Sequence, residues 1–209
     1  MNTSRLLQLA IPLVKEHGFT RKTLSLSVLS LPSPHQHPLS DTAISAIFGR
    51  GDEARKALFK AWLEQGRREM LHSENKSLAP VLKSRLSWNE PVLRYLPEAF
   101  ALIASPASGI PPLDLRPALK HAATIADQAC YISGDASVGT AWYTRRASLA
   151  TIYAAAELHQ LTSPTTAYGF LDNLLTTPQS AEKAIGEVGL FADYIGKSWA
   201  GILRSSGIF

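Results

Sequence analysis

The sequence predicts an all-α protein, and three observations carry that prediction. Apolar residues recur at steps of three and four along most of the chain, which is the period of an amphipathic helix. No stretch alternates apolar and polar residues for long enough to indicate a strand. Of the 209 residues 45% are hydrophobic and 18% are charged, so the chain is too apolar to be disordered and can bury a core.

The first fifty residues are expected to form three short helices. The first helix ends at Gly18, and Pro12 inside it is expected to kink it. Thr20 is the predicted N-cap of the second helix, which precedes a loop enforced by three prolines within residues 32–38. The third helix is expected to begin with Ser40 or Asp41 as its N-cap.

The predicted helices after residue 51 are longer and richer in apolar residues. The expected segments, in order, are 52–71, one through Leu82 and Leu86, one through Leu93, Leu96, Phe100 and Ile103, one from about Leu119 to Gly134, 142–161, 167–175 and 181–203. We expect three parts: a helix-turn-helix-like head over residues 1–50, a helical body over 51–178 and a C-terminal amphipathic helix over 179–209.

Three short helices followed by a longer fourth resemble the start of TetR-type regulators. The run from Ile47 to Ala54 is similar to that family's turn into its fourth helix. This resemblance implies a helix-turn-helix head on a helical body that holds a ligand pocket. A TetR-type DNA-binding regulator with a small-molecule pocket is therefore the alternative function.

The chemistry of the head argues against sequence-specific DNA binding. The helix in the recognition position, residues 40–47, has no Lys, Arg, Asn or Gln to read base edges and carries Asp41. The turn before it is longer than the usual three or four residues. Four cations, Arg21, Lys22, Arg50 and Arg55, remain candidates for phosphate contacts, but scattered cations usually form a solvated face. We expect no nucleic-acid partner.

Composition narrows the remaining function classes. The net charge of +4 allows an anionic partner, either a nucleic acid or a lipid head group. One cysteine, Cys130, excludes an intrachain disulfide and any cysteine-cluster metal site. No run approaches the roughly 20 apolar residues of a transmembrane helix. Because residues 1–17 are predicted to be helical, we expect that any transit peptide is absent from this chain or has been removed.

No catalytic constellation is recognisable, so we expect no enzyme, no catalytic residues, no cofactor and no metal. Phosphate-loop and nucleophile-elbow patterns are missing. A carboxylate-bridged di-iron site needs two Glu-x-x-His motifs, and the sequence has one, Glu69–His72, so such a site is not encoded. His35 and His37 form a pair in the proline-rich loop, but a metal site needs further ligands, whereas His72 and His121 are isolated in the sequence. A metal-dependent enzyme using the histidine pair is a third hypothesis.

One segment has the composition of a protein interface. Asp135 precedes Trp142, Tyr143, Arg145 and Arg146, which open a predicted helix. Cations at a helix N-terminus act against the helix dipole, and such departures from local preference tend to mark function. Trp, Tyr and Arg are also the residues enriched in interface hot spots. Alternatively, the aromatic residues close the core and the arginines pair with Asp135 or Glu157.

The last predicted helix needs a surface to pack on. Its glycines each cost about 1 kcal/mol against alanine, which burial of its large apolar side chains outweighs. That surface is either the core, a partner or a bilayer. The predicted membrane-contact residues are Phe191, Ile195, Trp199 and Ile202.

The interface segment also carries a family resemblance. Trp142–Ala147, with Gly134 and Asp135 just upstream and Phe170–Asn173 downstream, resembles the Coq nine family of mitochondrial ubiquinone-biosynthesis accessory proteins. The likeness runs from about Leu6 to the C-terminus and is weaker in the first half.

The resemblance implies a TetR-like fold without DNA binding that holds an isoprenoid lipid or phospholipid. It implies presentation of quinone intermediates from the inner mitochondrial membrane, on the matrix side, to the demethoxyubiquinone hydroxylase. It places the docking patch at Trp142, Tyr143 and Arg146, and TetR-like bodies often form homodimers. The candidate lipid-binding residues, which form either a cavity or a filled core, are Leu86, Leu93, Leu96, Phe100, Ile125, Leu149, Ile152 and Tyr153.

Overall fold

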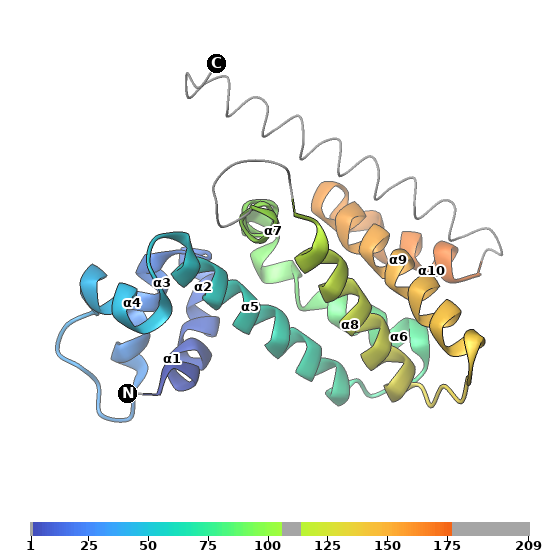
Figure 1. Cartoon of the computed structure of the whole chain (residues 1–209), viewed down its shortest axis with the longest axis horizontal. Coiled ribbons are helices and arrows are strands. Elements are labelled where there is room, and N and C mark those ends of the chain that lie inside the picture. Colours follow the sequence, from blue (N-terminus) through green and yellow to red (C-terminus); the bar gives the residue numbers. More distant parts are fainter. Residues whose placement is uncertain (1, 106–113, 177–209) are drawn as a thin grey trace, which may run out of the picture. The chain divides into compact units, whose positions relative to one another are not determined.

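The computed structural model describes residues 2–105 and 114–176. Within these ranges helices are the only regular secondary structure, so the all-α prediction is confirmed (Figure 1). The finer TetR-like architecture stays a prediction. The α-helices are α1 (Thr3–Ala10), α2 (Val14–His17), α3 (Arg21–Leu26), α4 (Asp41–Phe48), α5 (Asp52–Glu69), α6 (Leu78–Ser87), α7 (Leu96–Ala104), α8 (Arg116–Ile132), α9 (Thr140–Thr162) and α10 (Ala167–Thr176).

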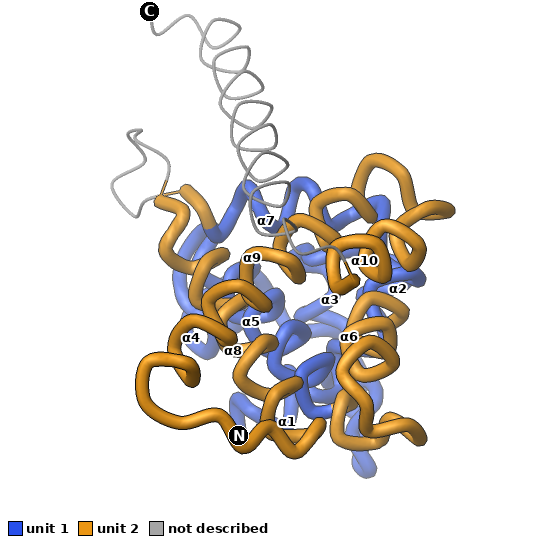
Figure 2. The backbone as a smooth tube through the Cα atoms, turned by 90° about the vertical axis from the view of Figure 1, so that its right-hand side faces the viewer, with its two compact units in different colours: residues 1–68, 88–103 blue, residues 69–87, 104–209 orange. Residues whose placement is uncertain are grey.

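The chain forms two compact units, which Figure 2 colours separately. Unit 1 comprises Met1–Arg68 and Trp88–Ile103, and unit 2 comprises Glu69–Ser87 and Ala104–Phe209. The two units are groups of residues that pack together. The predicted division into head, body and C-terminal helix stays a prediction, and its last part, 179–209, lies outside the described residues.

Local sequence signals set the helix ends of the N-terminal segment. The predicted kink at Pro12 is a 3-10 turn, Ile11–Leu13, between α1 and α2. The side chains of Thr20 and Ser40 accept hydrogen bonds from the first-turn amides of α3 and α4, as N-caps do. Gly18 has a φ of 65°, and a Cβ there would lie 2.9 Å from the ring of Tyr95, so the position requires glycine.

Aromatic rings fill the core of unit 1. Phe59 and Trp62 lie on the buried face of α5, and each meets the ring of Phe19 edge-on. Phe100 of α7 packs on Phe59, with ring centroids 5.2 Å apart, and Trp88 packs on Trp62 at 5.7 Å. This cluster joins the two stretches of chain that make up the unit.

Unit 2 is built on the pairing of α8 with α9, which lie side by side in Figure 1. Arg146 contacts Asp127 and, three turns further along α9, Glu157 contacts His121. Position advances on α9 as it recedes on α8, so the two helices are antiparallel. Helix α6 packs on α8, and α10 packs on both α9 and α6. The buried faces meet in one apolar core, in which small residues such as Ala155 and Ala156 let the helices approach closely.

The close approach of Gly66 in α5 to the indole of Trp88 yields a stability prediction. A Cβ at Gly66 would lie 2.5 Å from Trp88 Cδ1, whereas a Cβ at Gly169 of α10 meets nothing within 4 Å. Alanine gains up to about 1 kcal/mol of helix propensity at either position. Overpacking at Gly66 costs about 1–3 kcal/mol. We therefore expect Gly66→Ala to be less stable than Gly169→Ala by about that amount in urea unfolding followed by circular dichroism. Equal midpoints would contradict the packing.

Candidate partner-docking site

The turn between α8 and α9 is fixed by the end of α8. Gly134 has a φ of 71°, and its N–H donates to the carbonyl of Tyr131. The N–H of Asp135 donates to the carbonyl of Cys130, which completes a Schellman motif. The left-handed conformation explains why glycine precedes Asp135, and the motif aims the Asp135 side chain back toward α9.

The carboxylate of Asp135 is nearly buried and contacts the side chains of three residues. Its side chain is 3% exposed. Ser137 Oγ donates to Oδ2 over 2.6 Å, Arg146 Nη1 lies 3.0 Å from Oδ2, and Arg145 Nε lies 3.3 Å from Oδ1. The hydrogen bond from Ser137 lowers the pKa of Asp135 most, burial opposes it, and Arg146 lowers the pKa further. The carboxylate thus offsets two cations at the positive end of α9.

Arg146 ties the turn to both helices and to the aromatic pair. Its Nε lies 2.7 Å from Oδ1 of Asp127 on α8. Its guanidinium stacks over the ring of Trp142, 4.1 Å from the centroid. Trp142 in turn meets Tyr143 edge-on with centroids 4.8 Å apart. Trp142, Arg146 and Asp135 are therefore held in one arrangement before any partner binds.

The surface at this turn exposes aromatic area and a cation. Tyr143 is 70% exposed and Trp142 is 37% exposed, so the aromatic pair does not close the core. Arg145 is 54% exposed although it pairs with Asp135. The alternative considered from the sequence had two parts. The arginines do pair with Asp135, but the aromatic residues do not close the core. We call Asp135, Trp142, Tyr143, Arg145 and Arg146 the docking site; its role in binding stays a prediction.

The sequence analysis did not identify the residues of α8 and of the following turn that lie around this site. Asp127 lies on the other helix, 19 residues before Arg146, and only the antiparallel pairing brings it near. Tyr131 and Val138 are exposed on either side of the turn. The one signal available for Ser137 was its position two residues after Asp135, which suits an Asx turn.

The predicted lipid-binding residues fall into two groups. Five lie in the core of unit 2: Leu86, Ile125, Leu149, Ile152 and Tyr153. In unit 1, Leu96 and Phe100 are buried and Leu93 is half-buried. Their role in binding lipid stays a prediction. The predicted membrane-contact residues, Phe191, Ile195, Trp199 and Ile202, lie outside the described residues.

A buried polar cluster lies inside the core of unit 2. Tyr153 Oη donates to Glu157 Oε1 over 2.8 Å. His121 Nε2 lies 3.2 Å from Glu157 Oε2, and Arg85 Nη2 lies 3.7 Å from Oε1. Burial raises the pKa of Tyr153 well above its ordinary value, so its hydroxyl stays protonated. His121, isolated in the sequence, is thus placed beside Glu157 by the fold.

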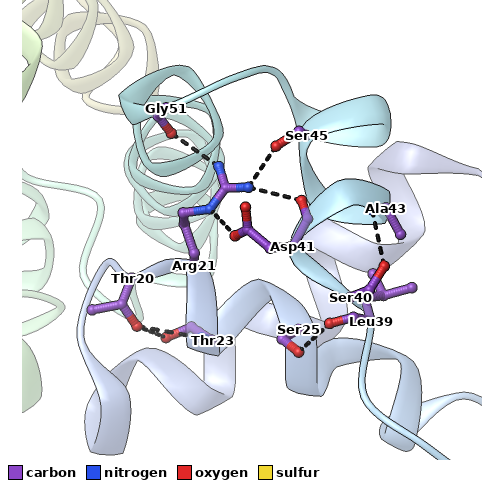
Figure 3. A network of polar contacts seen from close by, with 10 residues as sticks. All are labelled: Thr20, Arg21, Thr23, Ser25, Leu39, Ser40, Asp41, Ala43, Ser45 and Gly51. Atoms are coloured by element: carbon purple, nitrogen blue, oxygen red, sulfur yellow. Dashed lines mark hydrogen bonds and ion pairs between the residues drawn. The ribbon is translucent and has the colours of Figure 1, made fainter.

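In the head, two of the four cations considered for DNA contacts are engaged with protein groups, and Figure 3 shows the contacts of one of them, Arg21. Arg21 donates to Asp41 Oδ1 over 2.6 Å, to Ser45 Oγ over 2.7 Å and to the carbonyl of Gly51 over 3.1 Å. This guanidinium holds α3, α4 and the following turn together. Arg55 pairs with Asp52 and Glu98. Lys22 and Arg50 remain exposed.

The described residues also bear on the metal and membrane hypotheses. In the described part of the chain, no three His, Cys, Asp or Glu side chains are grouped as metal ligands would be. His35 and His37 lie in the exposed proline-rich loop. Nor is any helix within 2–105 or 114–176 long and apolar enough to cross a membrane.

Comparison with known proteins connects the docking site to a family. The family model of COQ9 (Coq nine) matches residues 115–176, which hold α8, α9, α10 and the whole docking site. The resemblance to the COQ9 family is confirmed. Mitochondrial ubiquinone-biosynthesis COQ9 proteins from Drosophila melanogaster and Schizosaccharomyces pombe are 28% and 30% identical over 162 and 129 residues. The Bos taurus protein is 27% identical over 161 residues.

The relatives are longer than this chain. The matched residues cover 76%, 60% and 74% of this chain in the fly, yeast and cattle comparisons. They cover 48%, 49% and 49% of the relatives, so the chain spans about half the length of the curated COQ9 proteins it matches. The likeness to COQ9 therefore concerns a segment that includes the docking site.

The lowered pKa of Asp135 yields a pH prediction. A folded-state pKa below the ordinary value near 3.8 means that ionised Asp135 stabilises the fold above about pH 4 and that this contribution is lost on further acidification. Asp135→Asn removes the titrating group. We expect the urea midpoint of the wild type to fall more between pH 6 and pH 3 than that of Asp135→Asn. The exposed Glu74→Gln is the control and should keep the wild-type slope; identical slopes for all three would refute the prediction.

Proposed function

We propose that this chain is a non-catalytic, lipid-binding accessory protein of ubiquinone biosynthesis in mitochondria. The likeness to ubiquinone-biosynthesis COQ9 proteins supports the pathway and the compartment. In this proposal the protein binds isoprenoid quinone intermediates, or a phospholipid, and presents them from the matrix side of the inner membrane to the demethoxyubiquinone hydroxylase. The single observation that carries it is the preorganised docking site inside the matched segment.

The docking step uses exposed groups that are already ordered. An aromatic pair held by Arg146 and Asp135 loses little conformational entropy on binding, which favours affinity. Truncation of a Trp or Tyr at the centre of an interface typically costs about 2 kcal/mol or more. Partly exposed Arg145 offers a cation to an acidic group on the partner.

The lipid step uses the apolar core of unit 2. A long-tailed lipid is driven into such surroundings by the apolar area it removes from water, at about 25 cal/mol per Å². Leu149 and Ile152 of α9 and Ile125 of α8 belong to that core. In the same proposal, residues 181–203 contact the membrane surface and two copies of the chain associate. These two features rest on the sequence pattern and the family resemblance.

Docking is tested by truncating the aromatic pair. We expect Trp142→Ala and Tyr143→Ala each to weaken binding of the purified hydroxylase by about tenfold or more, because each removes exposed hot-spot area. Leu71→Ala, an exposed apolar residue of the same unit, is the matched control and should bind as the wild type does. Binding is measured by surface plasmon resonance, with circular dichroism as the folding check. Unchanged affinity in both aromatic variants would contradict the docking proposal.

Lipid binding is tested on the purified chain by native mass spectrometry. We expect masses above that of the protein, and an organic extract that contains isoprenoid quinones or phospholipids. The spray conditions are set on a known lipid-binding protein so that bound lipid survives. An apo mass alone, with an extract free of both lipid classes, would refute the lipid proposal and leave docking as the function of the chain.

A further inference from the structure

A cleft between α1 and α5, both in unit 1, has an apolar floor and a positively charged rim. We propose that this cleft binds a small organic acid, with its carboxylate on Arg68 and with a ring or a chain of about six carbons on the floor. The cleft lies outside residues 115–176, to which the family model matches. The proposal therefore concerns a second site, and it does not depend on the proposed lipid binding or docking.

The cleft forms where one face of α1 lies opposite one face of α5. Its lining consists of two sets of residues, each with the spacing of a single helix face: Ser4, Leu7, Gln8 and Ile11 on one side, and Ala61, Glu64, Gln65 and Arg68 on the other. The buried residues of α1, Leu6 and Ala10, lie on a different face of that helix. Helix α1 packs on α3 and on the 3-10 turn Ser27–Ser30, and this packing leaves the cleft open beside it.

The size and the floor of the cleft suit a small apolar group. The volume of the cleft is about 180 Å³. Because an apolar cavity of about 150 Å³ holds a benzene molecule, the cleft has room for a six-membered ring or a chain of similar size. Its apolar residues, Leu7, Ile11 and Ala61, are half-buried. An inorganic phosphate would leave these side chains in contact with water, whereas the carbons of an organic acid cover them.

The rim of the cleft has a surplus of positive charge. Both carboxylate oxygens of Glu64 accept hydrogen bonds from Arg67, over 2.9 Å from Nε and 2.7 Å from Nη2. Arg68 Nε also donates to Glu64 Oε1, over 3.2 Å. One carboxylate thus faces two guanidiniums, and the hydrogen bond from Arg67 lowers the pKa of Glu64 most, so that Glu64 stays ionised. An anionic ligand balances the remaining charge, whereas a cationic ligand would compete with both arginines for Glu64.

Arg68 keeps donors for such an anion. Its side chain is 54% exposed, and its hydrogen bond within the described part of the chain uses Nε alone. The two terminal nitrogens of a guanidinium can donate in parallel to the two oxygens of a carboxylate. Across the cleft, the first turn of α1 contains Ser4 and no acidic residue, so the dipole of α1 adds to the attraction for an anion.

The test compares benzoate with benzamide, a probe of the same shape without the charge, by NMR titration of the full chain. We expect the wild type to bind benzoate about tenfold more tightly, because hydrogen bonds between charged groups are the stronger ones. The preference should fall toward unity in Arg68→Gln. It should persist in the matched control Arg50→Gln, which removes an exposed arginine of the same unit outside the cleft. Ala61→Leu fills the floor and should bind neither probe.

Three results would overturn the proposal. The first is that benzoate causes no saturable shift of the amide signals of α1 and α5 in the wild type. The second is equal binding of the two probes, or a preference that survives in Arg68→Gln. The third is tighter binding of inorganic phosphate than of benzoate, unchanged in Ala61→Leu, which would make the cleft a site for a bare anion. Circular dichroism checks folding, and Arg68→Gln alone decides the matter where Ala61→Leu does not fold.

Discussion

The antiparallel packing of α8 on α9 is the constraint on which unit 2 depends. It places Asp127 against Arg146 at one end of the pair and His121 against Glu157 further along. The turn that makes the pairing possible ends in a Schellman motif, and the same motif turns Asp135 toward the arginines. The pairing of α8 with α9 therefore produces both the docking site on the surface and the polar cluster in the core.

These two groups of charges differ in what surrounds them. At the docking site Arg145 is 54% exposed, and nearly buried Asp135 holds Arg146 against the ring of Trp142, so the pairing orders an exposed surface. In the core, Arg85 and Glu157 lie among apolar side chains, where a charge without a counter-charge would be destabilising by about 3–5 kcal/mol. The first arrangement orders an exposed surface, whereas the second links α6, α8 and α9 inside the core through Arg85, His121 and Glu157.

The match to the COQ9 family model falls on α8, α9 and α10, where both groups of charges have most of their members. Unit 1 lies outside that match. Its α3–α4 region was predicted to be helix-turn-helix-like, and there Arg21 uses its donors to fasten α4 and the following turn to α3. A guanidinium engaged in that way is not available to phosphates, which agrees with the missing base-reading side chains of α4.

Four features could be predicted from local sequence, because each depends on neighbours within a few residues: the all-α class, the cap at Thr20, the break at Pro12 and the unusual Trp142–Arg146 segment. The structure selects Ser40 over Asp41 as the cap of α4. The same local reasoning identified Asp135 as a partner of the arginines but left Glu157 as an equal candidate. Only the tertiary structure separated them: Asp135 meets Arg145 and Arg146, whereas Glu157 lies beside Arg85, 72 positions away in the chain. It alone brought His121 to Glu157 and Gly66 against Trp88. These contacts depend on which faces of distant helices meet, and hydrophobic periodicity gives the apolar face of a helix without specifying the helix that covers it.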